Sequence, residues 1–127
     1  MEAIPNSHPE IDLPGAQGFW EYLDRLVASS RLVIDRPKGS THPRYPDLIY
    51  PLDYGYLQGT RAMDGGGIDF WLGSLAPPLI SGVICTIDLF KKDAEINILL
   101  GCSQGEVETI LEVSNQESMR AVFLPRP

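Results

Sequence analysis

Apolar side chains recur every three or four residues near the start of the chain, between Gln17 and Ser29. Polar residues such as Glu21, Asp24 and Arg25 take the positions in between. This spacing predicts an amphipathic helix that packs one face on a core. The apolar face consists of Phe19, Trp20, Leu23, Leu26 and Val27.

A second helix is predicted near the C-terminal end of the sequence, where Ser103 and Glu106 have the spacing of a capping box. Apolar residues then follow on one helical stripe until about residue 115; they are Val107, Ile110 and Leu111. The two predicted helices therefore bracket the middle of the chain.

Between these helices the pattern changes to the alternation that is typical of strands. The clearest case is the segment 81–89, which a turn at Lys91-Lys92-Asp93 connects to the next strand. Further strands are predicted at 31–35, 68–73, 95–100 and 120–124.

Two segments of the sequence differ from these predicted helices and strands. The segment 44–58 is aromatic and interrupted by prolines, so we expect short edge strands and turns there. Residues 1–14 contain three prolines and no periodicity, which indicates an extended arm. Strands dominate without a βαβ rhythm, so the prediction is a single mainly β (α+β) domain over residues 1–127, a small antiparallel barrel with flanking N- and C-terminal helices.

The net charge of −7, from 17 acidic and 10 basic residues, argues against binding to nucleic acid or to an anionic membrane surface. It favours cations, so an anionic substrate is expected to arrive with metal ions. Cys85 and Cys102 have no metal-site spacing and are expected to be reduced, which is consistent with a cytoplasmic protein.

Four aspartates form two pairs with the same five-residue spacing, Asp64 with Asp69 and Asp88 with Asp93. Carboxylates that flank turns in this way can converge on a hard divalent cation, and Mg²⁺ is the natural candidate. The tyrosine-rich run from Tyr50 to Tyr56 precedes them, and phenol hydroxyls can donate to phosphoryl oxygens. The alternatives are that these aspartates form turns and a solvated hairpin tip, and that the tyrosines pack a barrel wall.

The residues Tyr50-Pro-Leu-Asp-Tyr-Gly-Tyr56, Asp64-Gly-Gly-Gly-Ile-Asp69 and the later pair Asp88 and Asp93 resemble, in order and spacing, the motifs of soluble family I inorganic pyrophosphatases. Upstream, Asp35 takes the place of a glutamate in that family, and Arg44-Tyr45 takes the place of a lysine-tyrosine pair. The resemblance implies a five-stranded barrel of OB-like topology and magnesium-dependent hydrolysis of pyrophosphate to two phosphates.

The resemblance also implies roles for particular residues. The metal ligands would be Asp35, Asp64, Asp69, Asp88 and Asp93, with Asp69 shared between two ions whose bridging water attacks the phosphate. Arg44, Tyr50 and Tyr54 would bind the substrate, and Asp69, Tyr54 and Arg44 would carry the catalytic roles. A homo-oligomer is expected.

The chain departs from the family pattern in its catalytic groups. Gly66 stands where the family has the aspartate that activates the water, and loss of such a base typically costs about two to four orders of magnitude in rate. Glu95 reverses the charge of a family lysine, and neither the family's hairpin nor its C-terminal tyrosine-lysine pair is present. The alternative function is therefore a catalytically diminished relative that binds Mg²⁺ and phosphate ligands or serves as an assembly partner.

Overall fold

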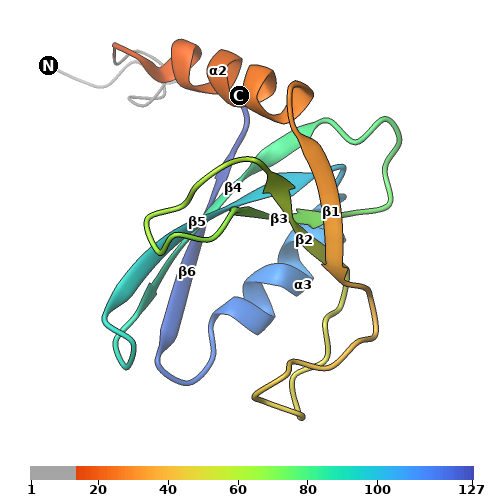
Figure 1. The fold of residues 1–127 in the computed structure, drawn as a ribbon, viewed down its shortest axis with the longest axis vertical. Helices are drawn as coiled ribbons and strands as arrows, with labels where there is room; N and C mark the ends of the chain where they lie inside the picture. The colour runs from red at the N-terminus through yellow and green to blue at the C-terminus, as the bar shows by residue number, and fades with distance from the viewer. Residues whose placement is uncertain (1–13) are drawn as a thin grey trace, which may run out of the picture.

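The structure, a computed structural model, describes residues 14–127. Nearly all of the expected arm, residues 1–13, lies outside the described residues. The described chain forms two helices and six strands (Figure 1). In chain order they are α2 (Ala16–Ala28), β1 (Arg31–Arg36), β2 (Asp53–Gln58), β3 (Ile68–Leu72), β4 (Ile80–Asp88), β5 (Asp93–Leu100), α3 (Gln104–Ser114) and β6 (Met119–Pro125).

The predicted helices and most strands are confirmed within a few residues at their ends. The capping box of α3 is formed in full, because the Glu106 backbone N–H donates to the Ser103 hydroxyl at 3.2 Å and the Ser103 N–H donates to the Glu106 carboxylate at 2.9 Å. Neither helix of the described chain has the length and apolar content needed to cross a membrane.

The predicted five-stranded antiparallel barrel is wrong. The six strands form one open sheet in the order β1-β2-β3-β5-β4-β6, and β3 pairs with β5 in parallel. The hairpin of β4 and β5 folds back so that β5 lies between β3 and β4. Closure would need hydrogen bonds between β1 and β6, which are the two edges of the sheet. Alternation in the sequence predicts strands but neither their neighbours nor their direction.

The prediction of edge strands for segment 44–58 is also wrong, because β2 lies inside the sheet between β1 and β3. Gly55 permits this position. A Cβ atom there would lie 1.8 Å from the Val33 carbonyl oxygen, so only glycine lets β1 approach β2 this closely.

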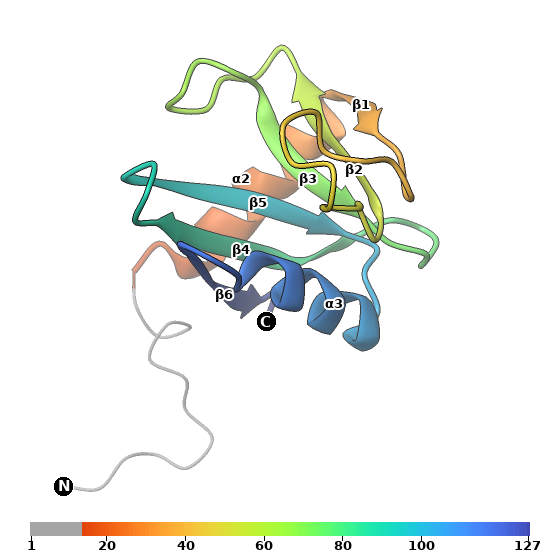
Figure 2. The same ribbon diagram turned by 90° about the horizontal axis from the view of Figure 1, so that it is seen from below.

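The sheet buries a different apolar cluster on each face. On one face Leu57, Phe70 and Ile98 pack against the partly buried side chains of α2. On the other face Trp71, Ile84 and Leu99 pack with residues of α3. Figure 2 shows α3 and the loop between β1 and β2 on one side of the sheet and α2 on the other. We call the side with α3 the α3 face; it carries the candidate site.

An ion pair ties the C-terminal end of the described chain to α2. The two guanidinium nitrogens of Arg126 contact the two carboxylate oxygens of Asp24, with Nη2 to Oδ2 at 2.7 Å. Helix α2 nevertheless covers only part of its face, since Ile87, Ile96 and Val122 are each more than half exposed.

Candidate functional site

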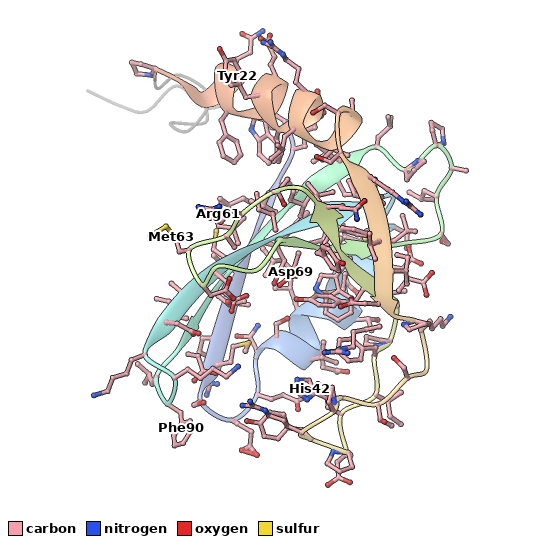
Figure 3. All side chains as sticks on the ribbon, in the orientation of Figure 1. Tyr22, His42, Arg61, Met63, Asp69 and Phe90 are labelled. Atoms are coloured by element: carbon pink, nitrogen blue, oxygen red, sulfur yellow. The ribbon has the colours of Figure 1, made fainter. Side chains whose placement is uncertain are left out.

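Five carboxylates on the α3 side of the sheet act on one another electrostatically, and we call them the acidic cluster. Asp69 belongs to β3, Asp93 and Glu95 to β5, Asp64 to the loop before β3, and Asp35 to β1. Strand alternation places the members on β3 and β5: Phe70 and Ile98 pack on the α2 side, so their neighbours Asp69 and Asn97 point to the α3 side. Figure 3 labels Asp69 within the sheet.

Asp69 is half-buried, whereas Asp35, Asp64 and Asp93 of the acidic cluster are exposed. Its burial raises the pKa of its carboxyl group, and the negative charges of Asp64 and Asp35 raise this pKa further. A hydrogen bond from the Tyr54 hydroxyl and the positive charge of Arg36 act in the opposite direction. Asp64 and Asp35, which were predicted with Asp69 as metal ligands, are thus within electrostatic range of it.

Glu95 joins the cluster although the sequence analysis did not count it among the site residues. It is half-buried, and this burial raises the pKa of its carboxyl group. The charges of Asp69, Asp93 and Asp64 raise that pKa as well, while Lys91 lowers it. The sequence signal for Glu95 was its position two residues after Asp93, because strand alternation places two such side chains on the same side of a sheet.

Asp64 lies in the exposed loop that connects β2 to β3. Its Oδ1 atom accepts a hydrogen bond from the Gly66 backbone N–H at 2.9 Å, so it also acts as a turn former. A Cβ atom at Gly66 would meet only this same oxygen, at 3.5 Å. The space next to Asp64 is thus open to a side chain at position 66.

A β-bulge in β1 positions both Asp35 and Arg36. Ile34 pairs with Gly55 and Arg36 pairs with Tyr54, so Asp35 is an extra residue in the strand. The bulge turns Arg36 to the face that carries Tyr54. Arg36 was not among the predicted site residues, because alternation in the sequence does not reveal a bulge.

His42 lies in the loop between β1 and β2 (Figure 3), within electrostatic range of three cations. Burial lowers the pKa of the His42 imidazole, and the charges of Arg36, Lys91 and Arg44 lower it further. We call Arg36, Arg44 and Lys91 the basic cluster. Arg44 was predicted to bind substrate, whereas Arg36 and Lys91 were not among the predicted site residues. Each of these two also acts on the acidic cluster, Arg36 on Asp69 and Lys91 on Glu95.

The two predicted substrate-binding tyrosines differ in their surroundings. Tyr50 is buried, and its ring centroid lies 5.4 Å from that of Tyr54 and 5.9 Å from that of Trp71. Its ring therefore packs the core, as the alternative interpretation held. Tyr54 also contacts Trp71, but its hydroxyl reaches Asp69, and its pKa is raised by burial and then by the charge of Asp69.

Asp88 is held differently from the other predicted metal ligands. Its Oδ1 atom accepts hydrogen bonds from the backbone N–H groups of Phe90 at 2.9 Å and Lys91 at 3.1 Å, and from the Ser118 hydroxyl at 2.8 Å. These bonds lower the pKa of its carboxyl group. Although Asp88 pairs with Asp93 across the hairpin, its carboxylate shapes the turn.

The donor chemistry of the acidic cluster fits a hard divalent cation, since all five side chains offer carboxylate oxygens. Within residues 14–127, however, no three acidic, histidine or cysteine side chains are close enough to hold a metal as they stand. The Nδ2 atom of Asn97, a buried residue beside Asp69, has no hydrogen-bond partner. A buried donor of this kind and carboxylates that raise one another's pKa are both unfavourable in the isolated chain.

No protein-family model matches this chain, and no curated protein matches it. Among solved structures, the chain is similar to an inorganic phosphatase from Anaplasma phagocytophilum, with 14% sequence identity and a TM-score of 0.51. The match covers 74% of this chain and 81% of that one. At this identity the similarity concerns the fold, which is thus similar to that of the inorganic phosphatase.

Proposed function

We propose that this protein hydrolyses a phosphoanhydride, with inorganic pyrophosphate as the expected substrate, in a reaction that requires a divalent cation such as Mg²⁺. The observation that carries the proposal is that the acidic and basic clusters adjoin on one face of the sheet. Arg36 lies within electrostatic range of both Asp69 and His42, and Lys91 within range of both Glu95 and His42. A complex of a metal ion with a phosphate anion presents the complementary pair of charges.

The acidic cluster would hold the cation, with Asp69, Asp64 and Asp93 as its expected ligands and Asp35 at its edge. A bound cation lowers the pKa of a water molecule and neutralises charge on the phosphates. Tyr54, whose hydroxyl favours the charged form of Asp69, would help to orient this carboxylate. The guanidinium groups of Arg36 and Arg44 can bind phosphoryl oxygens through paired hydrogen bonds.

The family resemblance of the motifs and the fold shared with an inorganic phosphatase both support this proposal. Gly66 remains the main departure, because it offers no base to the attacking water. We therefore expect a slow enzyme.

A second candidate is a protein that binds the metal-phosphate complex without turning it over. The glycine at position 66 and the separation of the carboxylates favour it. In this case the basic cluster would still bind the anion and Asp69 would still help to bind the cation.

The test is phosphate release from magnesium pyrophosphate by the purified protein, alongside the variants Asp69→Asn and Asp47→Asn. Asp47 is an exposed aspartate in the loop between β1 and β2 and serves as the matched control. Release that is lost in Asp69→Asn and retained in Asp47→Asn supports the hydrolase. Saturable binding of magnesium pyrophosphate without release supports the second candidate, and neither binding nor release contradicts both.

A further inference from the structure

The hairpin of β4 and β5 presents two acidic residues in contrasting states. Asp88 accepts three hydrogen bonds through one carboxylate oxygen. The side chain of Glu95, by contrast, takes part in none of the hydrogen bonds or ion pairs found among residues 14–127. A half-buried carboxylate without a partner is costly to a fold, so its presence calls for a compensating interaction.

Glu95 faces the other carboxylates of the cluster. It stands two residues after Asp93 on β5 and so points to the same side of the sheet. Asp69 lies on the adjacent strand β3, beside Asn97, which is two residues further along β5 than Glu95. Glu95 forms no ion pair with Lys91 in the described chain.

Asn97 supplies an independent observation at the same place. The residue is only 8% exposed, and its Nδ2 atom has no hydrogen-bond partner among the residues that the structure describes. The parallel pairing of Phe70 with Ile98 sets Asn97 beside Asp69, and strand alternation sets it on the same side as Glu95. A buried amide donor of this kind needs an oxygen acceptor, which an incoming ligand can provide.

We infer that Glu95 is a ligand of the divalent cation together with Asp69 and Asp93, and that it takes the part expected of Asp88. Asn97 then donates a hydrogen bond to an oxygen that arrives with the cation. This inference rests on the proposed function and adds a ligand to its site. The oxygen belongs either to the water around the cation or to a phosphate bound with it.

The experiment is a titration with Mn²⁺, followed by the electron paramagnetic resonance signal of the free ion, on the wild type and three neutralised variants. Glu95→Gln should weaken binding about tenfold or more, because it removes a charged ligand without changing the shape of the side chain. Asp88→Asn should stay within about a factor of two of wild type, since this carboxylate is occupied by the turn. Glu108→Gln, an exposed glutamate on α3, is the matched control and should not differ from wild type.

Two further measurements separate the remaining outcomes. Glu95→Asp keeps the charge but shortens the side chain, so an intermediate affinity is expected if the carboxylate itself contacts the ion. Asn97→Ala is titrated with Mn²⁺ alone and then with inorganic phosphate present. If Asn97 donates to water, the variant should already bind Mn²⁺ more weakly than wild type without phosphate. If Asn97 donates to phosphate, it should bind Mn²⁺ more weakly only when phosphate is present.

Wild-type affinity in Glu95→Gln, or a larger loss in Asp88→Asn, would overturn the inference while leaving the proposed function in place. If the wild-type protein binds no Mn²⁺ at millimolar concentration, the proposed function fails as well. Folding of each variant is checked by circular dichroism and melting temperature, and Glu95→Gln should fold at least as well as wild type without the ion because it relieves repulsion.

Discussion

The α3 face of the sheet carries two kinds of carboxylate, and they differ in what surrounds them. Asp88 and Glu106 each accept hydrogen bonds from backbone N–H groups at the start of a turn or helix, and the pKa of each carboxyl group is lowered as a result. Asp69 and Glu95 are enclosed among other acids, and the pKa of each is raised, first by burial.

This difference separates acids whose charge is stabilised by backbone donors from acids whose charge is opposed by burial and by other acids. The charge of Asp88 or Glu106 is stabilised by donors of the protein itself. The charges of Asp69 and Glu95 destabilise one another, and a bound cation would reverse this effect. The two kinds of acid thus differ in whether backbone donors already hold the carboxylate.

The largest effect expected from this comparison is the loss of pyrophosphate hydrolysis in Asp69→Asn. Asp69 is the most enclosed carboxylate of the cluster and the acceptor of the Tyr54 hydroxyl. We expect a drop of about two orders of magnitude or more. Asp64→Asn should lose less, because Asp64 is an exposed loop residue that already accepts a hydrogen bond from Gly66. Phosphate release at saturating magnesium measures both, and equal rates for Asp69→Asn and wild type would remove the proposed mechanism.

The next effect concerns Gly66→Asp, which adds a carboxylate to the cluster. Gly66 does not have a positive φ, unlike its neighbour Gly65 with φ 91°, and its Cβ position is open. An aspartate is therefore accommodated there without backbone strain. A well-placed base is worth roughly two to four powers of ten in rate, so even an imperfectly placed one should give a measurable gain.

Phosphate release by Gly66→Asp is compared with that of Gly66→Asn, which has nearly the same shape but cannot act as a base at neutral pH. A gain in the aspartate variant alone supports the missing-base interpretation. Equal rates in both variants and in wild type, with Mn²⁺ binding intact, would favour the protein that binds without turnover.

The third prediction tests the structural role of Asp88. Asp88→Ala removes the acceptor of three hydrogen bonds and leaves the donors of Phe90, Lys91 and Ser118 without it. We expect the melting temperature to fall by several degrees, while the stabilisation added by Mg²⁺ stays as in wild type. Asp47→Ala is the control for losing an exposed acid. A variant that keeps its melting temperature but no longer responds to Mg²⁺ would show that Asp88 is a ligand after all.

How far the sequence determines this structure differs between elements. The capping box of α3 and the apolar stripe of α2 were predictable because their signals are local, within four residues along the chain. The open sheet was not, since the insertion of β5 between β3 and β4 depends on long-range pairing. Gly55 was a local clue to close strands, yet its meaning needs the position of Val33 on the neighbouring strand.

The same distinction holds for the site. Asp64, Asp69 and Asp93 were predicted from spacing, and the structure brings them into one electrostatic neighbourhood. Arg36 reaches it only through a bulge, and Asn97 only through the parallel register of β3 and β5. Neither feature leaves a periodic trace in the sequence.

The smallest expected effect is on the pH dependence of stability, and here the two kinds of acid should differ in sign. The pKa of Glu95 is raised above its ordinary value of 4.5, so the folded state holds this proton more tightly than the unfolded state does. Its contribution to stability is then fully present below pH 4.5 and is lost as the pH rises through the folded-state pKa. The pKa of Asp88 is lowered from 3.8, so its contribution is present above pH 3.8 and is lost as the pH falls through the folded-state pKa.

Glu95→Gln should therefore gain stability relative to wild type as the pH rises from acid towards neutrality. Asp88→Asn should instead lose stability relative to wild type as the pH rises, over a more acidic range. Melting temperatures in metal-free buffer between about pH 3 and pH 8 measure both differences. Saturating Mg²⁺ should then cancel or reverse the advantage of Glu95→Gln, because the ion stabilises the wild-type carboxylate and has one ligand fewer in the variant. A difference between Glu95→Gln and wild type that stays constant with pH, with and without Mg²⁺, would mean that Glu95 is an ordinary surface acid and that the contrast with Asp88 has no functional meaning.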